Sequence, residues 1–216
     1  MGRKSLVCLN IAIIGDGKMP ATLAKCFAHA GHNVFLGDAK AKHVPGSKVK
    51  RHKKLDNISH TTVESAAIVA DLIVVATTMD EVRELAYRLG DVRRKVVIDA
   101  TSFMLSRFGQ YVNTLNVLKA ITGCQHIVKC YNKTGYEDLV DETLESEEVD
   151  VFMAGDSKKA KELTKLLARD LSIGQCYDFG DSNMIATLDE MSMCWNKLNI
   201  SEGELIPANR RDNNAV

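Results

Sequence analysis

The chain has 216 residues, 45% of which are hydrophobic, and its 28 basic residues equal its 28 acidic residues in number. A chain of this length fits one large domain with a small appendage, and it can bury a sizeable apolar core without disulfides or metal ions. The formal net charge of zero excludes a charge-based argument for nucleic acid or membrane surfaces as partners, and no apolar run reaches the roughly 20 residues that span a bilayer. Because residues 1–10 lack the pattern of a secretory signal, we expect a cytoplasmic protein.

The six cysteines have the spacing of neither a metal site nor a disulfide framework. None of them forms a CxxC pair, and most lie in apolar runs, where a free cysteine packs as a small hydrophobic residue. We therefore expect reduced, structural cysteines, which fit a reducing compartment, and no bound metal. They are Cys8, Cys26, Cys124, Cys130, Cys176 and Cys194.

Strands and helices alternate from the start of the chain. Apolar runs and helical spacing predict, in chain order, a strand over 10–14, a helix over 21–30, a strand over 33–36, a helix over 62–69, a strand over 72–76, a helix over 79–89, a strand over 96–100, a helix over 106–118, strands over 126–131 and 149–154, a helix over 158–170, a strand over 175–179 and a helix over 182–198. The last helix is rich in methionine and apolar residues, so we expect it to form a domain or dimer core.

This order of elements predicts an α/β fold. Apolar strands separated by helices indicate a doubly wound, mostly parallel Rossmann sheet covered by helices on both faces, with a small C-terminal helical extension. We place the dinucleotide-binding domain at residues 1–156 and the extension, packed on the same core, at residues 157–216. In such sheets the ligand lies at the carboxyl ends of the strands, where the strand order reverses, so the loops after the first five strands form the candidate site.

A glycine turn, GDGKMP over residues 15–20, follows the first strand and opens the first helix. Gly15 permits a tight turn, and Gly17 permits the close approach of a pyrophosphate to the backbone. The N–H groups and the positive dipole end of the following helix favour phosphate binding. Pro20 occupies the third glycine position of the dinucleotide fingerprint, where it removes one N–H donor. The alternative is an ordinary turn between a strand and a helix.

Asp38 ends the second strand, about 20 residues beyond the glycines. A carboxylate there can accept hydrogen bonds from both adenosine ribose hydroxyls and would repel a 2′-phosphate, which favours NAD. The basic stretch that begins at Lys40 could instead hold a 2′-phosphate by charge, or it could be a solvated surface loop. The cofactor predicted from these residues is therefore NAD or NADP.

Several stretches together resemble one family: IAIIGDGKM, DLIVVATT, VVIDATS, HIVKCYNKTGYEDL and DVFMAGDSKKAKEL. In this order and spacing, from about residue 10 to residue 198, the chain resembles the deazaflavin (coenzyme F420)-dependent NADP oxidoreductases, with the cytosolic domains of six-transmembrane metalloreductases as relatives. The resemblance implies a Rossmann domain with a small C-terminal part over the nicotinamide, and hydride transfer between nicotinamide and a deazaflavin or flavin. It also implies a dimer. The family tends to have Gly-Ser-Arg after the second strand, whereas this chain has GDAK over residues 37–40.

Position by position, the resemblance implies roles for three groups of residues. It places Asp16, Lys18 and Met19 at the pyrophosphate turn, Thr77 and Thr78 at the nucleotide, and Ala100, Thr101 and Asn132 near the nicotinamide ribose or ring. Together with the residues named above, the candidate cofactor-binding residues are Gly15, Asp16, Gly17, Lys18, Met19, Asp38, Lys40, Ala76, Thr77, Thr78, Ala100, Thr101 and Asn132.

Hydride transfer between two stacked ring cofactors needs little acid–base assistance, because the cofactors carry the reaction and the protein aligns them. Asn132 could hydrogen-bond the nicotinamide amide, or it could close a turn. Lys133 or His126 could act as a general acid toward a carbonyl or quinone-like acceptor, or both could be structural residues. Asn132 and Lys133 are the candidate catalytic residues.

The sequence thus predicts an NAD(P)-dependent oxidoreductase that acts on a small-molecule redox acceptor and forms a homodimer. The alternative is a non-catalytic NAD(P)-sensing binding module, since one fold serves both uses. A third hypothesis, an imine or hydroxy-acid reductase with a large helical substrate domain, fits the short C-terminal part less well.

Overall fold

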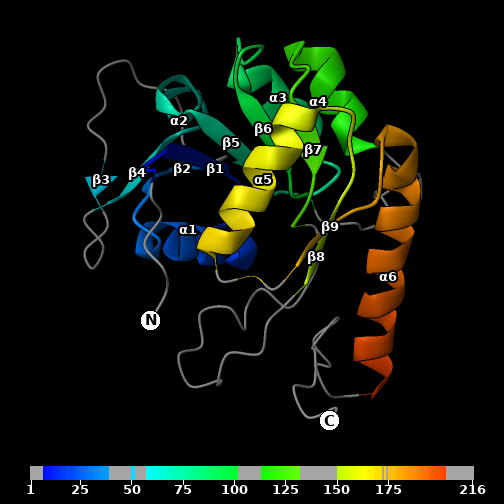
Figure 1. Cartoon of the computed structure of the whole chain (residues 1–216). Helices are drawn as coiled ribbons and strands as arrows, with labels where there is room; N and C mark the ends of the chain where they lie inside the picture. The colour runs from blue at the N-terminus through cyan, green and yellow to red at the C-terminus, as the bar shows by residue number, and fades with distance from the viewer. Residues whose placement is uncertain are drawn as a thin grey trace.

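The computed structural model describes residues 7–38, 50–51, 57–101, 113–131, 150–171, 173 and 175–202 (Figure 1). The main sheet has seven strands in the order β3-β4-β2-β1-β5-β6-β7. All neighbours are parallel except β3, which runs antiparallel to β4. The strands are β1 (Asn10–Ile14), β2 (Asn33–Asp38), β3 (Lys50–Arg51), β4 (Ile58–Thr62), β5 (Leu72–Val75), β6 (Val96–Asp99) and β7 (Ile127–Lys129).

This strand order confirms the doubly wound Rossmann fold predicted from the sequence. The chain builds outward from β1 through β2 to β4 and then crosses back to β5 on the other side of β1. The switch point therefore lies between β1 and β5, and a ligand is expected at the carboxyl ends of these strands. The helices are α1 (Lys18–His29), α2 (Val63–Val69), α3 (Val82–Leu89), α4 (Thr114–Thr122), α5 (Lys158–Asp170) and α6 (Ile185–Glu202), which follows the 3₁₀ turn η2 (Ser182–Met184).

The sheet separates two apolar clusters, one on each face. Side chains of a strand alternate between the faces, so Ile11 and Ile13 of β1 pack with α1 and α5, whereas Ala12 and Ile14 pack with α2, α3 and α4. Both clusters consist of fully or nearly fully buried residues. The layers are helix, sheet and helix, as Figure 1 shows, and the carboxyl ends of the parallel strands lie along one edge of the sheet.

The C-terminal unit adds a second small sheet. Strands β8 (Val151–Met153) and β9 (Cys176–Asp178) pair in parallel on either side of α5 in the sequence, and Ala154 forms an antiparallel bridge with Lys129 of β7. After η2, α6 runs past the β7 side of the main sheet (Figure 1). Its first turns pack into the α2–α3–α4 cluster through Ile185 and Leu188.

Some element boundaries differ from the expectation. The sequence predicted no strand at β4, whose residues ISHTT are mostly polar and are buried only at Ile58 and Thr62, so no apolar run marks the strand. The helix expected over 106–118 begins at Thr114, where Asn113 caps it by accepting from the backbone N–H of Asn116, and it ends at the left-handed Gly123; residues 102–112 lie outside the described part. Among the described residues, no helix is long and apolar enough to cross a membrane.

Candidate functional site

The β1–α1 turn requires glycine at its first position. Gly15 has φ of +147°, and a Cβ there would lie 2.0 Å from the carbonyl oxygen of Ala76, at the end of β5. The turn therefore brings two of the predicted site segments into direct contact. The N-cap of α1 is Gly17, which has no side chain to cap the helix, and the positive end of the helix dipole there favours an anion such as a pyrophosphate.

A cavity of about 370 Å³ opens beside this turn. Its size falls within the range of small-molecule sites, and it lies at the carboxyl ends of β1 and β2, as the sequence predicted. Asp38 lies in the lining together with the glycine turn, although the two are separated in sequence. The lining residues are Gly15, Asp16, Gly17, Pro20, Ala21, Leu36, Asp38 and His60.

The lining includes two carboxylates and one imidazole, those of Asp16, Asp38 and His60. All three are exposed, so water screens them and a ligand can reach them. His60 comes from β4, the strand that the sequence did not predict, and it pairs in register with Leu36 of β2. The two carboxylates favour a ligand with hydroxyl groups here over one with a further phosphate.

The loop after β5 follows at the carboxyl edge of the sheet, beside the glycine turn. Thr77 and Thr78 were predicted to line the nucleotide, but the structure shows their hydroxyls donating to the Glu81 carboxylate, at 2.5 Å and 3.1 Å. Ala76 donates its N–H to the carbonyl of Ile14 at 2.8 Å, next to the glycine turn. The segment thus begins next to the glycine turn, although none of its residues lines the cavity, and Glu81 is an additional residue that orders it; the predicted nucleotide contacts stay predictions.

A buried polar network lies at the carboxyl ends of β6 and β7. The Nζ atom of Lys129 lies 2.9 Å from Oγ1 of Thr114, 3.4 Å from Oδ2 of Asp99 and 3.3 Å from Oδ1 of Asp189. Oδ1 of Asp99 accepts from the backbone N–H of Thr101 at 3.0 Å, and the carbonyl of Thr101 accepts from Lys129 at 3.4 Å. Each of these side chains is at most 1% exposed.

Sequence reasoning missed this network, although a signal was present. A lysine in the apolar run IVKCY and an aspartate in VVIDA are charges in strands that otherwise read as fully buried. Such charges are retained in a core only when they are paired. Ala100 and Thr101, which were predicted to lie near the nicotinamide, directly follow this Asp99, and both are fully buried.

Three predicted residues lie outside the described part of the chain: Lys40, Asn132 and Lys133. Their predicted roles stay predictions. His126 is described, and its position gives no support to the idea that it acts as a general acid. It precedes β7, at the amino edge opposite the site, and its Nδ1 lies 3.1 Å from Oγ of Ser157. Among the described residues, no cluster of histidine, cysteine and carboxylate side chains could hold a metal ion.

Comparison with known proteins agrees with this geometry. Residues 10–102 match the model of the family described as NADP oxidoreductase, coenzyme F420-dependent. The match confirms the resemblance predicted from the sequence, and the matched segment contains the glycine turn, Asp38, the loop after β5 and the whole of β6. Among curated proteins, none matches the chain.

Solved structures share the fold at low sequence identity. A candidate F420-dependent NADP-reductase from Arthrobacter sp. FB24 has a TM-score of 0.74 at 20% identity, over 94% of this chain and 99% of that chain. An imine reductase from Myxococcus stipitatus in complex with NAD⁺ has a TM-score of 0.60 at 17% identity, over 89% of this chain and 61% of that chain. The pyrroline carboxylate reductase of Plasmodium falciparum with NADP bound has a TM-score of 0.60 at 14% identity, over 92% and 67% of the two chains.

Proposed function

We propose that this protein is an NAD(P)-dependent oxidoreductase that passes a hydride between nicotinamide and a small redox acceptor of the flavin or deazaflavin kind. The observation that carries the proposal is the cavity at the N-terminus of α1, lined by Gly15 and Gly17. The family match over residues 10–102 supports it, as does the fold shared with reductases whose structures contain NAD⁺ or NADP.

The residues present fit a dinucleotide. Gly17 has no Cβ to obstruct the backbone, and nothing but Pro20 lies near the place that a Cβ would take, so a pyrophosphate could approach the N-terminus of α1 closely. Asp38 would accept hydrogen bonds from the adenosine ribose. The nicotinamide supplies the hydride when the cofactor is bound, and the buried ends of β6 and β7 exclude water from that part of the edge.

We further propose that the protein prefers NADH to NADPH. Asp16 and Asp38 both line the cavity, and we expect the adenosine ribose beside Asp38, with the carboxylate of Asp16 nearby in the glycine turn. A 2′-phosphate would lie against this negative charge at a cost, whereas two ribose hydroxyls can donate to it. His60 is the basic residue of the lining, and one imidazole opposes two carboxylates.

Parallel calorimetric titrations with NADH and NADPH test both proposals. We expect tighter binding of NADH, and we expect Asp38→Ser to weaken NADH binding by about 10- to 100-fold, because charge-assisted hydrogen bonds are lost. Asp91→Ser is the matched control, since Asp91 is an exposed aspartate whose partner is Arg93, outside the cavity lining. If neither nucleotide binds at micromolar concentration, the proposed function is wrong; if NADPH binds more tightly, only the role of Asp38 is wrong.

Turnover distinguishes the enzyme from a non-catalytic NAD(P)-sensing module. The loss of nicotinamide absorbance would be followed with riboflavin phosphate, a deazaflavin or a quinone as acceptor. Oxidation of NADH that depends on the acceptor, and that Gly15→Ala abolishes, supports the oxidoreductase. Tight NADH binding without turnover on any of these acceptors favours the sensing module instead.

A further inference from the structure

The thiols of Cys130 and Cys176 lie side by side, although the two residues are far apart in the sequence. A side-chain hydrogen bond joins them, and both are free cysteines. Cys130 directly follows β7 and is fully buried, whereas Cys176 begins β9 and is half-buried. Neither lines the cavity beside the glycine turn, so the pair is separate from the candidate cofactor site.

Strand pairing brings the two cysteines together. Ala154, directly after β8, forms an antiparallel bridge with Lys129 of β7, with N···O distances of 2.8 Å and 3.1 Å. Val151 of β8 pairs in register with Cys176 of β9. Both thiols pack in the apolar cluster on the α1 and α5 face of the main sheet. The contact between them therefore follows from the fold of the C-terminal unit.

Helix α5 holds the chain beside each cysteine. Tyr131, the residue after the first one, has φ of +58°, a conformation that a residue other than glycine keeps only where its surroundings enforce it. Its hydroxyl donates to the carbonyl of Thr164 on α5 at 3.3 Å. Two residues beyond Cys176, the carboxylate of Asp178 accepts from Nζ of Lys161, also on α5, at 2.6 Å. One helix thus fixes the chain next to both thiols.

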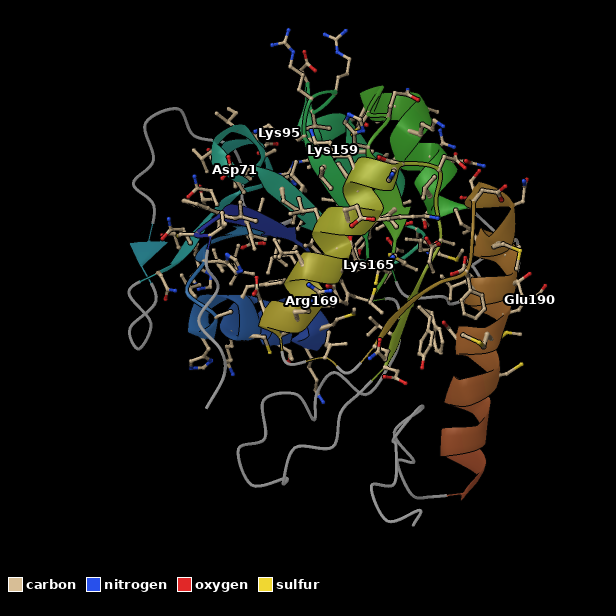
Figure 2. All side chains as sticks on the ribbon, viewed as in Figure 1. Asp71, Lys95, Lys159, Lys165, Arg169 and Glu190 are labelled. Atoms are coloured by element: carbon tan, nitrogen blue, oxygen red, sulfur yellow. The ribbon has the colours of Figure 1, made fainter. Side chains whose placement is uncertain are left out.

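The two thiols differ in reactivity. The hydrogen bond from Cys130 and the charge of Lys165, which Figure 2 shows on α5, lower the pKa of Cys176 against the opposing effect of burial. Burial raises the pKa of Cys130 well above its ordinary value. The residues on either side of Cys176 are exposed, so a small oxidant can reach it. A reactive thiol with a second thiol beside it is the arrangement in which oxidation leads to a disulfide.

We propose that Cys130 and Cys176 form a redox-sensitive site, at which hydrogen peroxide or a similar small hydroperoxide produces a reversible disulfide. The Cys176 thiolate attacks one peroxide oxygen, the O–O bond breaks, and the departing oxygen takes up the proton that the thiol lost. Cys176 is then a sulfenic acid. The sulfur of Cys130 bonds to that of Cys176, the S–OH bond breaks, and the hydroxyl leaves as water with the proton of Cys130. Together the thiols lose two electrons, which the peroxide gains.

The disulfide would join the end of β7 in the main sheet to β9 in the second sheet. It requires the two sulfur atoms to approach from hydrogen-bond contact to about 2.05 Å. The closed loop encloses residues 131–175, which include α5. A cross-link across a loop of this length stabilises a protein by restricting its unfolded chain. Oxidation should therefore raise the melting temperature by several degrees.

Peptide mapping of the full chain after treatment with hydrogen peroxide tests the proposal. Remaining thiols are blocked with N-ethylmaleimide, and the digest is analysed by mass spectrometry. We expect a peptide pair from one chain linked through Cys130 and Cys176, which dithiothreitol separates again, and a higher melting temperature of the oxidised protein. The absence of this linked pair, or a melting temperature that falls by several degrees, would overturn the proposal. The mapping uses the wild-type protein, so it stands even where a variant does not fold.

Three variants test the role of each thiol. Cys130→Ser should stop at the sulfenic acid of Cys176, which dimedone traps, whereas Cys176→Ser should give neither the linked pair nor a sulfenic acid at Cys130. Cys26→Ser is the matched control: Cys26 is also half-buried, but burial raises its pKa to about 11, so the linked pair should form at the wild-type rate. Dimedone labelling of Cys130 in Cys176→Ser as fast as that of Cys176 in Cys130→Ser would contradict the assigned roles and overturn the proposal.

Discussion

Carboxylates lie at both ends of the carboxyl edge of the main sheet, but they are exposed to solvent at one end and buried at the other. At the β1–β2 end, Asp16 and Asp38 line an open cavity and are exposed to solvent. At the β6–β7 end, Asp99, Lys129 and Asp189 are at most 1% exposed and hold one another. Exposed charges are screened and can select a ligand by its charge, whereas buried charges must be paired and therefore fix geometry.

The difference follows from what covers each end. The first turns of α6 pack over the β7 side with the buried residues Ile185 and Leu188, which removes water from the Lys129 network. The β1–β2 end is bordered by the short, polar β4 and by the glycine turn, which leave the cavity open. The carboxyl edge thus has an exposed end, where charge can select a ligand, and a buried end, where ion pairs fix the positions of the side chains. Such an edge suits a ligand whose two halves differ in chemistry.

The largest effect that would test this contrast is on stability at the buried end. Lys129→Met leaves Asp99 and Asp189 without their cation, and we expect a loss of about 3–5 kcal/mol in the free energy of unfolding, measured with urea. Arg93→Met removes an ion pair with Asp91 in which both side chains are well over half exposed, and we expect little change there. The double variant Lys129→Met with Asp189→Leu should recover part of the stability. If Lys129→Met is as harmless as Arg93→Met, the network contributes no rigidity.

The sequence alone predicted the elements whose signal is local. The apolar runs of β1, β5 and β6 and the spacing of α5 read correctly, because burial on both faces or on one helical stripe shows in a few neighbouring residues. The polar β4 was missed because its pairing with β2, more than 20 residues earlier in the chain, decides its structure.

The same distinction between local and long-range signals explains which parts of the candidate site could be predicted from the sequence. The glycine turn and Asp38 form a motif of fixed spacing, and the structure places them in one cavity. The two ion pairs of Lys129 join it to Asp99, 30 positions earlier, and to Asp189, still farther along the chain, so no local pattern could assemble the network. Asn132 and Lys133 lie outside the described residues, and their roles stay predictions, as does the homodimer, which sedimentation would test.

A smaller loss of stability is expected at the β1–β2 end, where the backbone of the glycine turn, rather than buried charge, determines the shape of the cavity. Gly15→Ala places a Cβ 2.0 Å from the carbonyl oxygen of Ala76 at a φ of +147°, so we expect a loss of about 3 kcal/mol and no NADH binding. Gly31→Ala is the matched control, because Gly31 has φ of +97° but no atom within 4 Å of the added Cβ. Its loss should be about 1–2 kcal/mol, from backbone strain alone, with NADH binding intact. Chemical unfolding and titration of both variants separate steric contact from strain, and equal NADH binding by the two would mean that the turn does not form the site.

The smallest effect that we expect is on the alkylation rates of two neighbouring thiols near the end of β7, one of which is buried and the other half-buried. Burial and the neighbouring Cys176 thiol raise the pKa of Cys130 well above its ordinary value, whereas the hydrogen bond from Cys130 and the charge of Lys165 lower the pKa of the half-buried Cys176. Since the thiolate is the nucleophile, iodoacetamide at about pH 8 should modify Cys176 well before Cys130, as followed by mass spectrometry of the two peptides.

Two lysines of α5 provide the control for this prediction, and Figure 2 shows both on that helix. Lys165→Met should slow the alkylation of Cys176 by about two- to threefold, because a nearby positive charge that favours the thiolate is lost. Lys159→Met removes the same charge from the first turn of the helix and should leave the rate unchanged. Falling pH should slow the reaction of Cys176 as its thiolate is protonated. If Cys130 reacts as fast as Cys176 in the folded protein, the β7 end opens to solvent far more readily than its buried ion pairs imply, and the contrast between a rigid end and an open end would not hold.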